Sequence, residues 1–403
     1  MKLNGTVALM ALGCATIAGP AQAKIISVEA GADAQERLQT ALIEAEPGDV
    51  VQIGAGRFDL TDGLSLDVGK VTVRGAGPDA TVLSFKGQKA AGEGLLVTSD
   101  DVVLRDFAVE DSKGDGIKSK GADRIVYHNV RVEWTGGPKA TNGAYGVYPV
   151  ESTDVLVDAV TVKGASDAGI YVGQSKNIVV RNSNAMFNVA GIEIENSYNA
   201  DVHNNRATRN TGGILVFDLP NLPQMGGHSV RVFNNDVAEN DTPNFAPKGN
   251  IVASVPMGTG VMVMANRNVH VFENRFRGNA TANVMVIAYK QAFDDKNYDP
   301  LARDIVVRNN HHGRAGWAPG FDGGAQLAAA FGGSLPPILW DGTGAGKAVL
   351  QVREDVPVLS LNLKRPDSPM TEAQPARVDL SAGAPLAEPI AVVLPAAMEA
   401  AIR

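Results

Sequence analysis

The chain has almost no cysteine. Its single cysteine is Cys14, which lies within the first two dozen of 403 residues. If that stretch is removed on export, the mature protein has no thiol, which excludes a disulfide framework and any thiolate site. Beyond the N-terminal stretch, no apolar run approaches the length of a membrane-spanning helix.

An excess of positive charge is also missing. The chain has 36 Lys and Arg against 44 Asp and Glu, and removal of Lys2 with the N-terminal stretch leaves 35 against 44, a net charge of −9. A nucleic-acid-binding protein is expected to have a basic surface. The composition therefore predicts no nucleic-acid partner.

Common metal-ligand spacings are absent as well. None of the six histidines stands in an HxH or HxxxH pattern, so we expect no zinc site. There is no clear calcium-binding aspartate cluster, and we assign Asp294-Asp295 to a solvated loop. No cofactor is predicted, although calcium stays open as a ligand.

The N-terminus carries the features of a secretory signal peptide over residues 1–23. Lys2 precedes an apolar run over 7–12, and Ala21-Gln22-Ala23 is a small-residue cleavage site. The alternative is lipoprotein processing at Cys14, because Leu12-Gly13-Cys14 partly matches a lipobox. Both routes predict an exported protein, periplasmic or extracellular.

A short repeat organises the rest of the chain. A glycine is followed by an apolar–x–apolar triplet, a polar turn, a second apolar alternation and an asparagine, with most steps at 22 or 23 residues. Such a unit cannot bury its own apolar side, so stacking in register indicates a solenoid, and the period of 2 indicates strands. The leading glycines are Gly94, Gly116, Gly146, Gly169, Gly191, Gly213 and Gly260.

The segments that flank the repeat are predicted to cover its ends. Residues 24–47 are expected to form a strand and an amphipathic helix over 33–46, with Leu38, Leu42 and Ile43 on one face and Pro47-Gly48 ending it. This helix would cover the open end of the strand stack. Residues 316–403 are expected to form a C-terminal cap and a poorly ordered tail.

An asparagine column follows the second alternation of each repeat. Asparagine tolerates left-handed backbone geometry, and equivalent residues in successive coils can form an amide ladder, so we predict a structural role. The column contains Asn129, Asn182, Asn204, Asn234 and Asn309, and Asn205, Asn235, Asn274 and Asn310 lie beside it.

This pattern resembles the right-handed parallel β-helix of the pectin-lyase-like superfamily, including periplasmic repeat proteins of the NosD and mannuronan-epimerase type. The resemblance covers roughly residues 48–315 and implies an all-β solenoid of about nine coils. It also implies a polysaccharide lyase, hydrolase or epimerase, or a protein without chemistry.

Four insertions depart from the repeat and are predicted to wall the outer face of one sheet. They lie at about 136–145, 218–229, 241–259 and 288–303, before or after the first strand of a coil. Long loops on one face of a solenoid usually mark the binding face.

The residues that point outward on this face form the candidate site. Because side chains alternate along a strand, Lys118, Tyr148, Tyr171, Glu193 and Glu195 are expected to face the walls, and we predict them as catalytic residues. With neighbouring coils about 4.8 Å apart, Lys118 and Glu193 would be about 14 Å apart, too far for an ion pair. We predict that the face binds a polysaccharide or oligosaccharide, through residues that also include Lys120, Trp134, Lys139, Tyr145, Phe217 and Asp218.

Two kinds of chemistry remain open at this face. Elimination or epimerisation of a uronate needs a cation such as Lys118 and a base such as Tyr148 or Tyr171, with a lowered tyrosine pKa. Hydrolysis needs two carboxylates, and Glu193 and Glu195 offer them at a Cα spacing of about 6.6 Å. Two further alternatives remain: the face binds a ligand without catalysing a reaction, or it is an ordinary exposed strand face with no functional role.

Three methionines give a different hypothesis. Met262, Met264 and Met285 follow on adjacent coils, and thioethers suit Cu(I), although methionine beneath an insertion also packs well. With the NosD-type resemblance, they imply as alternatives a non-catalytic accessory protein for copper or redox-enzyme maturation, or a structural surface protein. In every case we expect a monomer.

Overall fold

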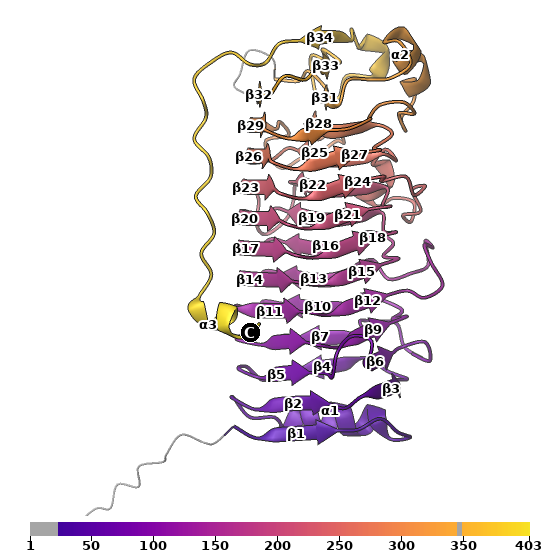
Figure 1. The fold of residues 1–403 in the computed structure, drawn as a ribbon, viewed down its shortest axis with the longest axis vertical. Coiled ribbons are helices and arrows are strands. Elements are labelled where there is room, and N and C mark those ends of the chain that lie inside the picture. The colour runs from indigo at the N-terminus through magenta and orange to yellow at the C-terminus, as the bar shows by residue number, and fades with distance from the viewer. Residues whose placement is uncertain (1–22, 345–348) are drawn as a thin grey trace, which may run out of the picture.

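The computed structural model describes residues 23–344 and 349–403 of the chain. The predicted signal peptide and Cys14 therefore lie outside the described residues, apart from Ala23. The described chain is a right-handed parallel β-helix, drawn in Figure 1 as one long stack of strands. The predicted all-β fold is confirmed.

Three parallel sheets run the length of the stack. Sheet A contains β1 (Ile25–Val28), β2 (Val50–Ile53), β5 (Thr72–Arg74), β8 (Val103–Arg105), β11 (Ile125–His128), β14 (Thr153–Asp158), β17 (Lys176–Arg181), β20 (Tyr198–His203), β23 (His228–Phe233), β26 (Arg267–Phe272), β29 (Arg303–Arg308) and β32 (Leu350–Arg353). Sheet B contains β3 (Gly56–Asp59), β6 (Thr81–Ser84), β9 (Ala108–Glu110), β12 (Arg131–Glu133), β15 (Thr161–Lys163), β18 (Asn184–Met186), β21 (Arg206–Thr208), β24 (Asp236–Ala238), β27 (Arg275–Arg277) and β30 (His311–His312).

Sheet C carries the predicted first strand of every coil. It contains β4 (Leu64–Leu66), β7 (Leu95–Val97), β10 (Ile117–Lys120), β13 (Tyr145–Val150), β16 (Ala168–Gly173), β19 (Ala190–Glu195), β22 (Gly212–Phe217), β25 (Thr259–Met264), β28 (Ala282–Ile287), β31 (Ile338–Trp340), β33 (Val358–Ser360) and β34 (Ala376–Val378). Only β34 pairs antiparallel among the described strands. It lies at the C-terminal end of the ladder.

The ladder is longer than the sequence predicts. Among the described residues, sheet A has twelve strands, because β1 before residue 48 and β32 after residue 315 join the same ladder. On the C-terminal side, β31, β32 and β33 continue the sheets beyond residue 315. The predicted boundaries of 48 and 315 therefore do not mark the ends of the strand stack.

The inside of the helix is one continuous apolar core. The predicted inward positions of sheet C are all fully buried within it, including Ile117, Val147, Ile170, Ile192 and Ile214. The leading glycines lie where successive coils come closest. A Cβ on Gly191 would stand 2.5 Å from the carbonyl oxygen of Gly213 in the next coil. Only glycine fits there without displacing backbone.

The asparagines have the predicted structural role. Asn129, Asn182, Asn204, Asn234 and Asn309 all have φ between 50° and 55°. Beside this column, Asn205, Asn235, Asn274 and Asn310 form a ladder, in which the amides of the first three donate to the next coil at 2.9–3.1 Å. A second ladder, which the sequence analysis missed, joins Asn188, Asn210, Asn240 and Asn279.

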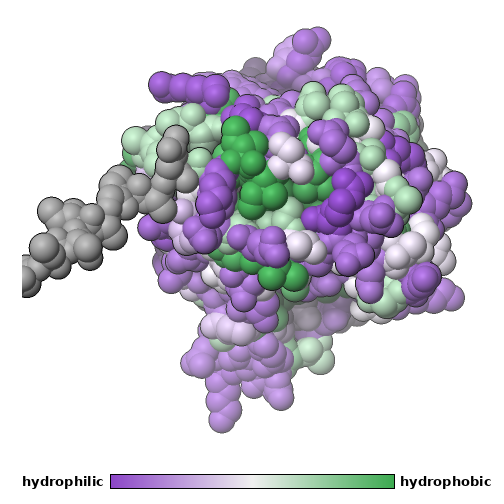
Figure 2. Space-filling model, turned by 90° about the horizontal axis from the view of Figure 1, so that it is seen from below, coloured by the Kyte–Doolittle hydropathy of each residue, from purple (hydrophilic) through white to green (hydrophobic). Residues whose placement is uncertain are grey.

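The described part of the chain has five short helices beside the strands: α1 (Ala34–Glu44), η1 (Ile251–Ser254), α2 (Gly324–Ala330), η2 (Met370–Glu372) and α3 (Ala396–Ala400). Helix α1 contacts β1, β2, β3 and β4 and so covers the N-terminal end of the core, as predicted. Leu38 and Leu42 are buried, but Ile43 is 65% exposed, because a residue one position further lies about 100° around the helix. Figure 2 views this end and shows apolar atoms among polar ones.

The last residues return along the outside of sheet A. Beyond β34, the chain runs back past many coils to α3, which lies beside β11 (Figure 1). Leu394 and Met398 pack there on Val126, Leu156 and Val179. No helix within residues 23–344 and 349–403 is long and apolar enough to cross a membrane.

Candidate functional site

The outer face of sheet C carries the predicted column of side chains. Lys118 pairs with Tyr148, and Tyr171 pairs with Glu193. The register then continues through Leu215, Met262, Met285 and Leu339. Strands β10 and β19, which hold Lys118 and Glu193, are three coils apart, as the sequence predicted.

This face is covered, although the sequence analysis expected it to be exposed. Tyr171, Glu193, Glu195 and Phe217 are at most 7% exposed. Apolar side chains of three of the predicted wall loops fold over the face instead of standing beside it, and they form a second apolar cluster with it. Its members include Leu219, Phe245, Val252, Val255, Tyr289 and Tyr298.

Three tyrosines form one contact cluster on β13 and β16. The ring centroids of Tyr145 and Tyr171 are 4.5 Å apart, as are those of Tyr145 and Tyr148, and Tyr148 meets Tyr171 edge-on at 4.8 Å. The Nζ atom of Lys118 lies 4.8 Å above the Tyr148 ring and 3.2 Å from a carboxylate oxygen of Glu93. The cation is therefore already paired.

Three carboxyl groups lie against the tyrosines. Burial, reinforced by the other carboxyls, raises the pKa of Asp167 to about 7 and raises that of Glu193 well above its usual range. Burial raises the pKa of Glu195 to about 8, although its hydrogen bond with Tyr171 works in the opposite direction. We call these three residues and the three tyrosines the acid–tyrosine cluster.

Two buried oxygens of this cluster lack partners. Among the described residues, neither Oδ1 of Asp167 nor Oε1 of Glu193 has a hydrogen-bond partner. A buried polar atom without a partner is costly, and such atoms gather at functional sites. Gly173 also belongs to this arrangement, because a Cβ there would stand 2.2 Å from the Tyr171 hydroxyl. The missing side chain leaves room for that hydroxyl.

The tyrosines do not meet the condition for acting as bases. A tyrosinate base requires a lowered pKa, but burial and the nearby carboxyls raise the pKa of Tyr148 to about 12. The pKa of Tyr171 is raised well above its ordinary value by burial and by Glu195. Each tyrosine can instead offer a hydroxyl donor and an aromatic surface.

One of the loop segments over this face contacts the cluster through a hydrogen bond to Asp167. The side-chain amide of Asn250 donates to Asp167 at 3.3 Å, and η1 follows directly. Val252 and Val255 pack in the same apolar cluster as Tyr171 and Leu215. Access to Asp167 from this side therefore requires this segment to move.

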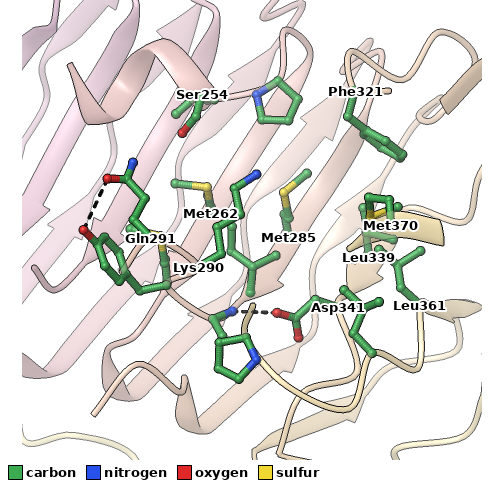
Figure 3. A pocket seen from close by; sticks show the side chains of 18 of the residues that line it. Ser254, Met262, Met285, Lys290, Gln291, Phe321, Leu339, Asp341, Leu361 and Met370 are labelled. Atoms are coloured by element: carbon green, nitrogen blue, oxygen red, sulfur yellow. Dashed lines mark hydrogen bonds between the residues drawn. The ribbon is translucent and has the colours of Figure 1, made fainter. Parts of the chain in front are cut away.

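A cavity of about 420 Å³ lies next to the cluster on the same face. Leu215, Phe217, Met262, Met264 and Met285 form its floor, and Figure 3 shows Met262 and Met285 pointing into it beneath Ser254. At the rim, Lys290 and Gln291 are exposed. In the coil after Glu193 and Glu195, the equivalent outward positions are Leu215 and Phe217. The face thus changes from acidic to apolar within one coil.

Several predicted binding residues have other roles. Trp134 packs in the inner core and donates from Nε1 to the Ser112 carbonyl at 2.8 Å. Asp218 is buried and accepts hydrogen bonds from the backbone of Gly226 and Gly227, so it closes its own loop. Neither is free to bind a substrate.

The remaining predicted residues divide by position. Lys120 is exposed and 3.8 Å from Glu151, and Lys139 is exposed in the loop before β13. Tyr145 belongs to the cluster, and Phe217 lines the cavity. The structure therefore brings Lys118, Tyr145, Tyr148, Tyr171, Glu193 and Glu195 together, and Phe217 lies beside them.

The methionines of the copper hypothesis line the cavity. Met262, Met264 and Met285 are all at most 7% exposed and pack against apolar loop residues. Within the described chain, no three His, Cys, Asp or Glu side chains gather as a metal site. That finding does not concern thioethers, so the copper hypothesis stays a prediction.

Sequence reasoning missed Asp115, Asp167 and Asn250. Burial raises the pKa of Asp115 to about 6, and its carboxylate accepts the backbone N–H of Tyr145 at 3.2 Å. Asp115 and Asp167 both stand two or three residues before an inward isoleucine, at the start of a sheet C strand. That repeated position was a usable signal, whereas the place of Asn250 in a long insertion was not.

Comparison with known proteins agrees with this architecture. Residues 71–223 match the family model described as a right handed beta helix region. The A-module of the mannuronan C-5 epimerase AlgE6 from Azotobacter vinelandii is similar, with 14% identity, a TM-score of 0.50, and coverage of 81% of this chain and 91% of that chain. A DFA-IIIase from Arthrobacter chlorophenolicus A6 has 12% identity and a TM-score of 0.51, with coverage of 82% and 94%.

No curated protein matches this chain. At such low identity, the likeness to solved structures shows the fold alone. The chain therefore has a right-handed β-helix fold.

Proposed function

We propose that the protein binds a polysaccharide on the outer face of sheet C and hydrolyses it at the acid–tyrosine cluster. The observation that carries this proposal is the set of raised carboxyl pKa values, about 7 for Asp167 and about 8 for Glu195, beside three contacting tyrosines. Carboxyl groups that titrate near neutral pH suit general acid and base roles. Tyrosine rings pack well on sugar faces.

The proposed chemistry uses two carboxyl groups. Glu195 is protonated at neutral pH and donates that proton to the departing glycosidic oxygen. Asp167, which titrates near neutral pH, accepts a proton from the water that attacks the anomeric carbon. Glu193 lies beside both carboxyls. Burial and these neighbours raise its pKa, which favours the uncharged acid, so the apolar site avoids a further negative charge next to Glu195 and Asp167.

The same geometry disfavours elimination through a tyrosinate base. Lys118, the cation that would neutralise a uronate, is held by Glu93 at 3.2 Å, and the Tyr148 and Tyr171 pKa values are raised. The similar structures include a protein named as an epimerase, which keeps uronate chemistry as the alternative outcome. A neutral polysaccharide is therefore our first choice of substrate class.

The test is a polysaccharide screen near pH 7 with two readouts, new reducing ends and the absorbance of unsaturated uronates. Glu195→Gln and Asp167→Asn should each lower kcat by about 100-fold or more, because each removes a proton-transfer group. Glu273→Gln is the matched control, since Glu273 is exposed and follows β26 of sheet A, away from the cluster on sheet C. Unsaturated product, or full activity in both variants, contradicts the hydrolytic proposal.

We also propose that the protein is exported and acts on an envelope or extracellular polysaccharide. The support is the signal-peptide pattern over residues 1–23. Fractionation of cells that express the full chain, with mass spectrometry of the mature N-terminus, tests the location. Cleavage before Lys24 supports signal-peptide processing, and a lipid-modified Cys14 supports the lipoprotein alternative.

A further inference from the structure

We infer that the methionine-lined cavity binds the acyl chain of an acylated saccharide. This inference rests on the proposed function, and it names the substrate class more closely. The cavity of about 420 Å³ falls within the size range of small-molecule pockets, roughly 300–1,000 Å³. It lies on sheet C one coil beyond Glu193 and Glu195.

The cavity and the acid–tyrosine cluster differ in the number of buried polar atoms that lack a hydrogen-bond partner. Asp167 and Glu193 each keep a buried oxygen without a partner among the described residues. Of the described residues that line the cavity, none has such an atom, and Asp341 at its edge is occupied by the backbone of Ala288 and Thr343. Polar side chains such as Lys290 and Gln291 lie at the rim, so on the methionine floor a polar ligand would find few partners, whereas an apolar chain would leave no polar group unpaired.

The lining residues suit a flexible chain. Methionine side chains are unbranched and adapt to irregular apolar shapes. Met262, Met264 and Met285 form the floor, and Leu339 and Leu361 close one side (Figure 3). Met370 at the rim is 42% exposed, so the cavity reaches the surface. An acyl chain can enter there without passing through the core.

One structural segment links the two parts. Asn250 bonds Asp167, while Ile251, Val252 and Val255 line the cavity. A chain that displaces η1 from the cavity therefore also uncovers Asp167. On this view, the acyl group both anchors the saccharide and opens the site for its polar part.

The test of the cavity uses probes that contain no sugar. Neutral primary alcohols from hexanol to decanol should bind the full mature chain in calorimetric titrations, with affinity rising about fourfold for each added methylene. Met285→Trp fills the cavity and should lower decanol affinity by about tenfold or more. Met186→Trp, on half-exposed β18 outside the cavity, should leave it unchanged.

A second variant guards against misfolding. Met370→Asp places a charge at the exposed rim and should also weaken decanol binding, with an unchanged circular dichroism spectrum. If decanol does not bind, or if both variants bind it as well as the wild type, the inference is overturned.

The link to the saccharide needs a second measurement. For any polysaccharide or oligosaccharide that the enzyme processes, removal of acyl groups with mild alkali should raise KM by about tenfold in the wild type. The same treatment should change nothing in Met285→Trp, and an unchanged KM in the wild type overturns the inference. Decanol binding without any glycan turnover would instead contradict the proposed function and leave the acyl site standing.

Discussion

At the scale of single residues, the acidic column on β19 has a thermodynamic cost. Glu193 and Glu195 point away from the inner core, yet the wall loops bury them. Burial disfavours the charged form, so their pKa values are raised rather than lowered. Apolar neighbours such as Leu215 and Val255 exclude the water that would otherwise solvate a carboxylate.

These shifts predict that the fold is less stable at higher pH. A carboxyl whose pKa is raised on folding binds more protons in the native state, so stability falls as pH rises from about 4 to the folded value. With folded pKa values of about 7 for Asp167 and about 8 for Glu195, the loss spans pH 4 to 8. The free energy of unfolding in urea should be at least about 1.4 kcal/mol lower at pH 8 than at pH 5.

The variant Glu193→Gln isolates this effect. It removes a buried carboxyl whose pKa is raised on folding, and whose ionisation in the unfolded chain favours unfolding as pH rises. The variant should therefore be more stable than the wild type at pH 8, with little gain at pH 5. Glu44→Gln, at an exposed position on α1, is the control. Equal stabilisation at both pH values would show that Glu193 is not the titrating group.

The glycine column gives a second prediction at this scale. Gly191→Ala should lower the free energy of unfolding by about 1–3 kcal/mol, because the new Cβ would stand 2.5 Å from the Gly213 carbonyl oxygen. Gly87→Ala is a fair control, since its Cβ would meet its nearest atom at 3.5 Å. Chemical denaturation of both variants measures the difference, and equal stability of the two would refute the argument from space.

At the scale of elements, the coils are joined by polar ladders as well as by strands. Asn235 donates to Asn274 and accepts from Asn205, and its own backbone N–H donates to Asn274. It is 1% exposed. The ladder fixes the turn between sheets A and B in several coils at once.

Loss of one rung should therefore be costly. Asn235→Ala leaves the buried backbone N–H of Asn205 without its acceptor, and it removes the side-chain bonds from Asn205 and to Asn274. We expect a loss of about 1–3 kcal/mol for the buried group left unsatisfied. Asn297→Ala, in an exposed loop, should change stability little. If the two variants unfold at the same urea concentration, the ladder does not stabilise the turn.

The repeat explains why the fold was predictable and the site only in part. Residues equivalent to Gly191, Ile192 and Asn205 recur at similar spacing in successive coils. This spacing fixes the register of the strands, so the sequence predicted which side chains point inward and which point outward. The solvent exposure of the outward side chains could not be predicted, because it depends on where insertions such as 241–259 fold over the sheet. Trp134 and Asp218 were misassigned for the same reason: each bonds to backbone that only the folded loop brings near.

At the scale of the whole molecule, the C-terminal segment acts as a strap along sheet A. Arg181 pairs with Glu399 at 2.7 Å, and Arg231 pairs with Glu388 at 3.0 Å. The backbone N–H of Val392 donates to Asp201 at 3.1 Å. These contacts join residues about 150 to 220 positions apart in sequence. The strap thus links the top of the stack to its lower half without adding a strand.

The anchor of this strap is apolar, which gives a prediction with an internal control. Leu394 and Met398 are at most 7% exposed against Val126, Leu156 and Val179, whereas the neighbouring Val393 is 87% exposed. Leu394→Asp combined with Met398→Asp should release the strap, since a buried aspartate without a partner is expensive. Limited proteolysis should then remove the last twenty or so residues within minutes while the β-helix stays intact.

Val393→Asp changes the same segment by the same chemistry at an exposed position, so its cleavage rate should match that of the wild type. The released strap also uncovers Val126, Leu156 and Val179, so the double variant should bind a hydrophobic dye more strongly. Equal cleavage of the double variant and Val393→Asp would mean that Glu388 and Glu399, rather than the apolar anchor, hold the strap. Charge reversal at Arg181 would then be the change that frees it.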